Sequence, residues 1–214
     1  PALIPTDTAV STYALIRDET AERKAAAFLL GDNLERTTQG GGIYTYTSQQ
    51  GAAAFRDTGS FDAAGSLSQE NAEAFCRDFC KAFSYDTPIF TLDETGSGTA
   101  TAVRLWNGTP VFNAAVTFTI DQGRVLSASG ALLPEAGAET SSGQKPLSAF
   151  AALTAFQQMR HASSSVVSSI TEVSLCYELQ STTAAPMALV PSWRIVTDTA
   201  TFYVNCISGT VRRA

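Results

Sequence analysis

The strongest constraint on the fold is a long alternating run that follows an Asn-Gly pair. Between residues 111 and 120, the side chains of Phe112, Ala114, Val116, Phe118 and Ile120 alternate with those of Val111, Asn113, Ala115, Thr117 and Thr119. A period of two is that of an antiparallel strand buried on one face. Asn107-Gly108, just before the run, is the preferred pair for a two-residue hairpin turn. The run therefore predicts an antiparallel sheet, with further strands over 88–93, 99–106 and 124–133.

Two segments before this sheet have the period of an amphipathic helix. From Asp18 to Gly31 the chain has an acidic N-cap residue, good helix formers and a C-terminal glycine. For a second helix between 66 and 83, Ser66 or Ser68 is the predicted N-cap. Its apolar side chains recur at helical spacing, at Ala72, Phe75, Cys76, Phe79, Cys80 and Phe83. Each helix therefore has one apolar face that needs a sheet to cover it.

Turn residues divide the chain between these helices into a short meander. Gly40 to Gly42 precede the alternating stretch 43–47, and a second alternating stretch follows Gly51. Aromatic side chains at strand spacing are more often core than a ligand platform. The predicted core residues of this meander are Tyr44, Tyr46, Phe55 and Phe61.

The second half of the chain repeats the order of helix and strands. The polar stretch from Pro134 to Pro146 is the best internal boundary. After it, Leu147-Ser148, Ala152, Phe156 and Met159 match Leu67-Ser68, Ala72, Cys76 and Phe79 at a constant offset of 80. The helix that this predicts ends at Arg160 and His161, and strands follow over 170–180, 189–198 and 201–213.

These patterns predict an α+β fold with two or three repeated units of a helix packed on an antiparallel meander sheet. Residues 1–65 hold the first helix and the short meander. Residues 66–134 and 146–214 each hold a helix and an antiparallel sheet. The units are expected to form one compact body.

Composition excludes several classes of protein. The 214 residues are 44% apolar and 16% charged, which favours a folded domain over a disordered chain. The net charge of -6 comes with scattered cations, so a nucleic-acid partner is not expected. No apolar run is long enough to cross a bilayer. The chain begins at Pro1, which predicts that a segment was removed upstream: a signal peptide, a membrane anchor or a stretch left out on cloning.

The residues do not form a recognisable reaction centre. His161, the single histidine, lies at a predicted helix end and has no marked serine nucleophile. Cys76 and Cys80 lie on one helix face without a C-x-x-C pair, which favours core thiols over a metal site. Cys176 and Cys206 lie on strands that could be neighbours, so both a disulfide and free thiols stay open. We predict no enzyme, no cofactor and no metal.

Large amphipathic rings near loops are the remaining candidates for contact with a partner. Trp106 lies beside the predicted Asn-Gly turn, and Trp193 follows Pro191. Interfaces favour tryptophan at such places. For Trp193 core packing is favoured, because its neighbours Ile195 and Val204 are apolar. Trp106 and Trp193 are therefore the candidate interface residues.

Three stretches together resemble a known family. LVPSWRIVTDTATFYVNCISGTV, residues 189–211, resembles the closing hairpin of YycI/YycH-type regulatory proteins and of PepSY-like domains. NGTPVFNAAVTFTIDQGRVLSASG, residues 107–130, resembles their middle sheet. AAAFLLG at 25–31 and IYTYTSQQGAAAFRDTG at 43–59 are similar to their first helix and meander. The likeness covers most of the chain and consists of strand and turn patterns without a catalytic motif.

The resemblance implies a non-catalytic extracytoplasmic domain, tethered by an N-terminal transmembrane helix outside this chain. Such a domain acts on a membrane sensor histidine kinase by protein contact. A PepSY-like inhibitor or chaperone of a peptidase is the first alternative. A small-molecule binder with a pocket between helix and sheet is the second. A homodimer is compatible with each of them.

Overall fold

The computed structural model describes residues 9–68, 71–163, 166–181 and 185–214. Three helices lie within these ranges: α1 (Glu19–Leu30), α2 (Ala72–Ala82) and α3 (Ala149–Ser163). The strands of the first half are β1 (Val10–Leu15), β2 (Glu35–Thr38), β3 (Tyr44–Ser48), β4 (Gly51–Phe55), β5 (Ser60–Ser68), β6 (Ile89–Leu92) and β7 (Gly98–Trp106). Those of the second half are β8 (Thr109–Asp121), β9 (Arg124–Ala131), β10 (Ala138–Gln144), β11 (Ile170–Gln180), β12 (Met187–Thr197), β13 (Thr201–Asn205) and β14 (Val211–Arg213).

The prediction of repeated helix-and-meander units is wrong. Strands hold 51% of the residues and helices 19%. All the strands join one mixed sheet, because β11 pairs in parallel with the beginning of β8 at Tyr177 and Val111. Two segments with no strand prediction also enter the sheet: β1 pairs with both β10 and β12. Non-local pairing has thus merged the expected units into a single sheet.

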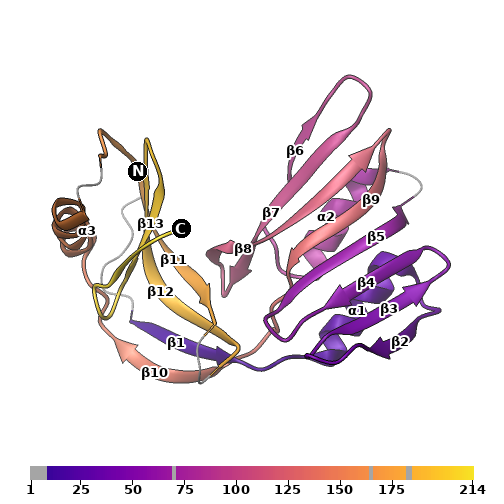
Figure 1. Cartoon of the computed structure of the whole chain (residues 1–214), viewed down its shortest axis with the longest axis horizontal. Coiled ribbons are helices and arrows are strands. Elements are labelled where there is room, and N and C mark those ends of the chain that lie inside the picture. The colour runs from indigo at the N-terminus through magenta and orange to yellow at the C-terminus, as the bar shows by residue number, and fades with distance from the viewer. Residues whose placement is uncertain (1–8, 69–70, 164–165, 182–184) are drawn as a thin grey trace.

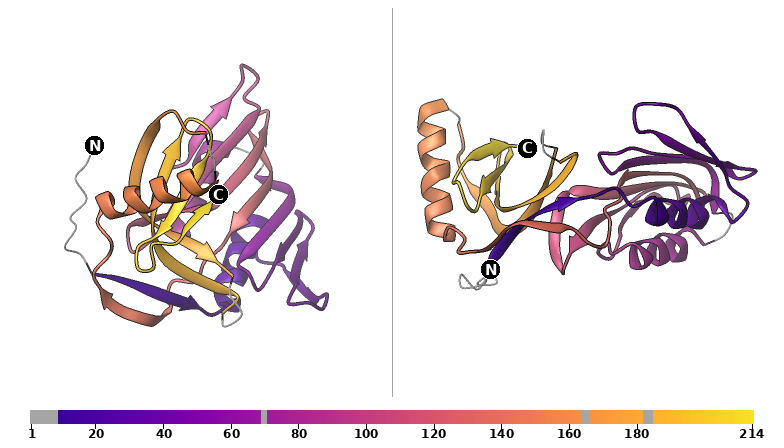
Figure 2. Two further views of the ribbon diagram at one scale, coloured as in Figure 1. Left: turned by 60° about the vertical axis from the view of Figure 1, so that its left-hand side comes forward. Right: turned by 90° about the horizontal axis from the view of Figure 1, so that it is seen from below.

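Two broad parts of this sheet are visible in Figure 1. In one part the strand order is β6-β7-β8-β9-β5-β4-β3-β2, and all these neighbours are antiparallel. The other part holds β1 and β10 to β14 with α3 beside it. Figure 2 shows α1 and α2 side by side on one face of the first part. That part therefore has a covered face, an open face and two terminal strands, β6 and β2.

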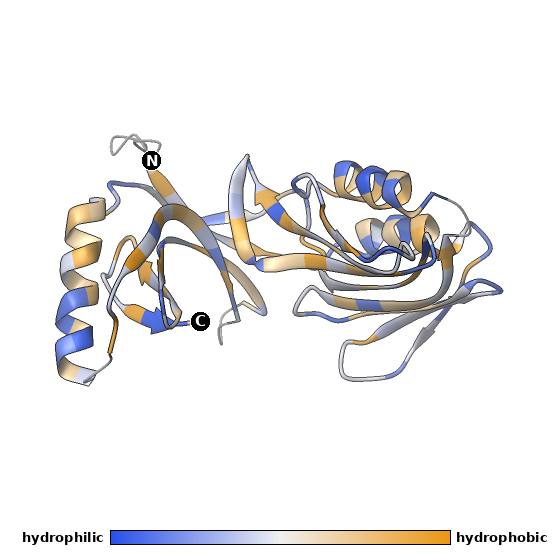
Figure 3. Ribbon diagram, turned by 90° about the horizontal axis from the view of Figure 1, so that it is seen from above, coloured by the Kyte–Doolittle hydropathy of each residue, from blue (hydrophilic) through white to orange (hydrophobic). Residues whose placement is uncertain are grey.

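The buried side chains form three clusters. The largest lies between the α1–α2 layer and the sheet, and it includes the predicted core residues Tyr46, Phe55 and Phe61. A second cluster joins α3 to β12 and β13 around Phe156 and Trp193. The third lies where β1, β8 and β12 meet. Figure 3 shows hydrophilic residues on the outward sides of α1 and α2, as the helical period predicts.

Local signals explain most helix and turn boundaries. The Asp18 carboxylate accepts hydrogen bonds from the backbone N–H of Thr20 at 2.9 Å and of Ala21 at 3.1 Å, which confirms the predicted cap of α1. Asn107 and Gly108 have φ of 49° and 78°, as a type I′ hairpin turn requires. The predicted serine cap of α2 is wrong. Ser66 and Ser68 belong to β5, and Asn71 caps α2 by accepting from the N–H of Ala74 at 3.1 Å.

Among the described residues, no helix combines the length and the apolar character that a membrane span needs.

Candidate functional site

The terminal strand β6 leaves one side of its backbone without a strand partner. Among the strands of the described residues it pairs only with β7, and Asp93 N–H donates to the Ser97 carbonyl at 2.9 Å in the same register. Because hydrogen-bonded pairs alternate along an antiparallel ladder, Ile89 and Thr91 bond to β7, while Phe90 and Leu92 direct their N–H and C=O groups outward. Strand β6 is therefore an open edge that can accept another strand.

Apolar side chains accompany this open edge. Ile89 is 74% exposed and lies on the open face of the sheet, opposite Thr101. Leu92 is 37% exposed. Phe90 is partly buried against the largest cluster, and the Arg77 guanidinium lies 5.3 Å from its ring centre. The edge thus offers exposed apolar surface on both sides of the strand.

The turn after β6 holds the edge in a fixed conformation. Asp93 Oδ1 accepts hydrogen bonds from Thr95 Oγ1 at 2.6 Å, Thr95 N at 2.8 Å and Ser97 N at 3.0 Å. The bonds from Thr95 and Ser97 hold the pKa of the Asp93 carboxyl below its usual range. Gly98 approaches β6 so closely that an added Cβ would lie 2.1 Å from the Thr91 carbonyl oxygen. The β6–β7 hairpin is therefore preorganised.

A groove of about 370 Å³ lies at the beginning of β6. It is lined by Arg77, Cys80, Lys81, Tyr85, Asp86, Thr87, Pro88 and Leu105. Arg77 pairs with Glu73 at 3.3 Å, whereas Lys81 has no ion pair among the described residues. Pro88 lines the groove and directly precedes Ile89 of β6, so a segment bound along β6 can extend towards it.

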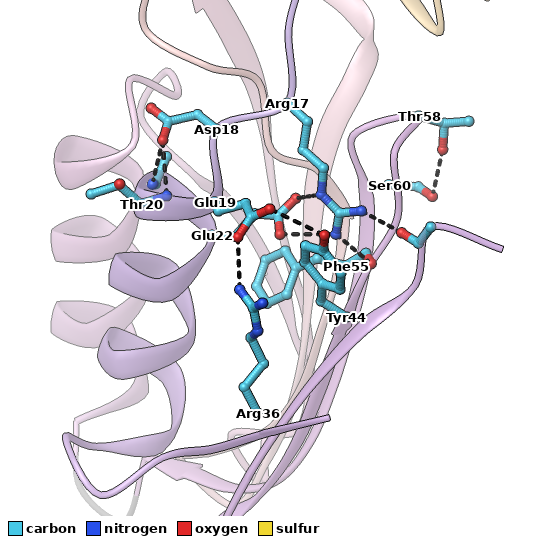
Figure 4. A network of polar contacts seen from close by, with 12 residues as sticks. Arg17, Asp18, Glu19, Thr20, Glu22, Arg36, Tyr44, Phe55, Thr58 and Ser60 are labelled. Atoms are coloured by element: carbon cyan, nitrogen blue, oxygen red, sulfur yellow. Dashed lines mark hydrogen bonds and ion pairs between the residues drawn. The ribbon is translucent and has the colours of Figure 1, made fainter. Parts of the chain in front are cut away.

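A polar network surrounds the beginning of α1, at the other end of the same sheet (Figure 4). Glu19 accepts from Arg36 of β2 at 2.7 Å and from the Tyr44 hydroxyl at 3.1 Å. These hydrogen bonds, with that of Arg36 the larger cause, lower the pKa of Glu19. The network therefore fixes strand β2 against the helix.

A cleft of about 470 Å³ opens beside this network. It is lined by Glu19, Thr20, Arg23, Leu34, Arg36 and Tyr46. Burial raises the pKa of the Tyr46 hydroxyl, so this group stays protonated at neutral pH. No group of three or more His, Cys, Asp and Glu side chains with the geometry of a metal site occurs among the described residues. The cleft offers hydrogen-bond donors and cations.

The structure places both candidate interface tryptophans inside the molecule. Trp106 is 4% exposed, and its ring centre lies 5.3 Å from that of Tyr13 of β1. Trp193 is 3% exposed and donates from Nε1 to the Leu147 carbonyl at 2.8 Å. The two rings belong to different clusters, so the fold does not bring them together.

The remaining chemically active side chains are separated as well. His161 is exposed in the last turn of α3. The four cysteines are free and buried, so Cys176 and Cys206 carry thiols, and Cys176 Sγ donates to the Ser192 carbonyl at 3.3 Å. Burial raises the pKa of Cys76 and of Cys80 to about 12, as expected for core thiols.

Sequence reasoning predicted β6 as a strand but did not identify it as an edge. Pro88 is the available signal, since proline is common beside edge strands. The cleft next to α1 has no comparable signal. Arg23 lies on an exposed face of α1, and Arg36 lies on β2, whose sequence shows no alternation of apolar residues. Neither position indicates from the sequence that the two side chains line one cleft.

Comparisons with known proteins support the fold alone. No family model matches the chain, and no curated protein matches its sequence. An uncharacterized protein from Eubacterium rectale, known from a crystal structure, is similar with a TM-score of 0.53 at 12% identity, over 96% of this chain and 81% of that one. The Bacillus megaterium YpeB C-terminal domain gives a TM-score of 0.42 at 14% identity, over 94% and 98% of the two chains. Of the two scores, the first alone exceeds 0.5.

Proposed function

We propose that this domain works by binding another protein, without a catalytic centre, and that strand β6 is the contact. The observation that carries the proposal is the 74% exposed side chain of Ile89 on a strand with an unpaired backbone edge. Folded proteins usually protect such edges with charged side chains, bulges or a covering element. The residues of β6 are Ile89, Phe90, Thr91 and Leu92, none of which is charged.

Strand addition at this edge supplies both affinity and orientation. The outward backbone groups of Phe90 and Leu92 can pair with an extended segment, and alternate side chains of that segment then face Ile89 on one side and Leu92 on the other. Burying these apolar side chains contributes about 25 cal/mol for each Å² removed from water. The fixed Asp93 turn lowers the entropy cost of ordering the edge.

The sequence resemblance to YycI/YycH-type proteins leads to a more specific proposal about the partner and the location of the domain. The partner is then a membrane sensor histidine kinase, and the domain lies outside the cytoplasm, tethered by a segment before Pro1. The stretches at 107–130 and 189–211 support this proposal, and both are parts of the sheet. A peptidase partner, as for a PepSY-like inhibitor, is the competing outcome of the experiment.

Site-specific cross-linking in the native cell tests the proposal. A photoreactive amino acid replaces Ile89 in the full-length gene product, and a matched sample carries it at Phe150, which is 80% exposed on α3. We expect capture of one defined protein from position 89, lost when Leu92→Lys is added, and none from position 150. Capture of a sensor histidine kinase supports regulation of a kinase. Capture of a peptidase would instead favour a PepSY-like inhibitor of that peptidase. Capture from position 150 alone would overturn β6 as the contact.

A further inference from the structure

Strand β2 is the second terminal strand of the first part of the sheet, at the opposite end from β6. Its four residues are all exposed, and within the described part of the chain its one strand partner is β3. Gln39 N–H donates to the Ile43 carbonyl at 3.1 Å in the β2–β3 register, which sets the alternation of hydrogen bonds. Glu35 and Thr37 therefore bond to β3, while Arg36 and Thr38 direct their backbone groups outward.

A hollow lies on each face of the sheet beside this edge. The cleft of about 470 Å³ is on the helix-covered face, where Arg36 and Thr38 direct their side chains. On the open face, a second hollow of about 370 Å³ is lined by Asn33, Glu35, Thr47, Ser48 and Gln49. A strand added to β2 directs alternate side chains to the two faces, so it can fill both hollows at once.

The two hollows carry opposite charge. In the helix-side cleft Glu19 is already occupied by Arg36 and Tyr44, while Arg23 has no ion pair among the described residues. The Arg23 guanidinium in this cleft is therefore available to bind an acidic side chain. On the open face, Glu35 is exposed and likewise has no ion pair within the described part of the chain. The Glu35 carboxylate beside that hollow is therefore available to bind a basic side chain.

We propose that β2 binds an extended acidic-then-basic segment of a partner protein as an additional antiparallel strand. The residue opposite Arg36 is acidic and enters the cleft beside Arg23. In an antiparallel pair the next residue of the segment lies opposite Glu35, on the other face, and it is a lysine or arginine. Arg36 stays bonded to Glu19, and this pair forms the wall of the cleft (Figure 4).

This site is independent of β6 in both position and chemistry. The β6 contact is apolar and uses the opposite end of the sheet, whereas β2 selects by charge. The charges of β2 would otherwise serve only to prevent edge-to-edge association. That alternative gives no role to the positions of Arg23 and Glu35, which lie without an ion pair at hollows on opposite faces among the described residues. It predicts that no peptide binds.

Fluorescence anisotropy with a labelled blocked peptide tests the site. The peptide consists of valine and threonine with a central Glu-Lys pair, and the protein is the full chain. Arg23→Glu is expected to weaken binding about fivefold, because an attractive charge pair between the helix and the peptide's glutamate becomes repulsive. Replacing the peptide's glutamate by lysine is expected to restore the affinity of this variant. Lys24→Glu is the matched control, since Lys24 is an exposed neighbour outside the cleft.

A backbone variant separates strand addition from simple charge attraction. Thr38→Pro removes an outward N–H while leaving the β2–β3 hydrogen bonds in place, so we expect loss of peptide binding with an unchanged circular dichroism spectrum. Equal affinities for the parent, Arg23→Glu and Thr38→Pro chains would overturn the proposal. So would a concentration-dependent dimer that Thr38→Pro abolishes without any peptide binding, because the occupant would then be a second copy. Absence of binding here leaves the β6 cross-link result unaffected.

Discussion

Arg17 donates two hydrogen bonds to the buried carboxylate of Glu22, from Nε at 2.7 Å and from Nη2 at 2.9 Å. The same guanidinium donates to the Gly42 carbonyl and, at 3.0 Å, to the Phe55 carbonyl. Arg17 lies in the connection between β1 and α1, so it fastens this connection to the meander strands (Figure 4). One side chain therefore joins three segments that are distant in sequence.

Removing this side chain is expected to destabilise the fold strongly. The side chains of Arg17 and Glu22 are 16% and 7% exposed, so Arg17→Leu leaves a buried carboxylate without its partner. Loss of one member of a buried pair costs about 3–5 kcal/mol. Urea unfolding measures the difference, with Arg213→Leu at an exposed position as control, for which a change within about 0.5 kcal/mol is expected. Equal stability of the two variants would contradict the anchoring role of Arg17.

The Glu22 carboxyl gives the stability a specific pH dependence. Burial raises its pKa above the ordinary 4.5 and outweighs the hydrogen bonds from Arg17, which lower it. A raised pKa in the folded state means that protonation favours folding, so this contribution is present below the ordinary pKa and is lost as the pH rises. Relative to Glu22→Gln, the parent protein is expected to lose stability as the pH rises above the ordinary carboxyl pKa of 4.5. Unfolding free energies of both proteins across this range check the sign, and a parent that gains relative stability refutes it.

Sequence patterns predicted the elements whose side chains alternate or recur locally. The run 111–120 is part of β8, and α1 begins after Asp18 as expected. The buried faces of α2 and α3 contain Cys76 and Phe156, as their periods require. In each case the signal lies within one segment, because burial of one face repeats at the period of the element.

The overall sheet could not be predicted, because its decisive contacts are non-local. Strand β1 pairs with β10, where Tyr13 is opposite Glu139, and the polar composition of 138–144 had predicted a connection. The parallel join of Tyr177 to Val111 likewise has no local signature. Trp106 was a surface candidate because it precedes a turn, but β1 brings Tyr13 against its ring. Strands β6 and β2 are edges because no further strand among the described residues pairs with their outer sides, and no single segment of sequence shows this.

The four buried thiols are expected to be unreactive in the native protein. Burial raises the pKa of Cys76, Cys80 and Cys206 to about 12, so the thiolate is scarce at neutral pH. A thiol reagent should modify them slowly without denaturant and modify all four in guanidinium chloride. Ser129→Cys, at an exposed position of β9, is the control and should react at once. Reaction of only two thiols under denaturing, non-reducing conditions would contradict four free thiols and show that one pair of cysteines is oxidised.

The two faces of β8 should respond very differently to truncation. Phe118 is 0% exposed, and its ring meets that of Phe79 of α2 edge to face at 5.4 Å between centres. Phe118→Ala leaves a cavity under the helix layer and is expected to cost about 3–5 kcal/mol. Its neighbour Thr119 lies exposed on the opposite face, opposite Thr99 and Ser127. Thr119→Ala should change the unfolding free energy by no more than about 0.5 kcal/mol.

This comparison also tests that the open face is free in the isolated domain. Urea unfolding of the two variants at the same protein concentration measures both free energies. If Thr119→Ala were as destabilising as Phe118→Ala, a second layer would have to cover the open face. A small effect at Thr119 leaves the face uncovered, and both edges remain accessible to the partners proposed for them.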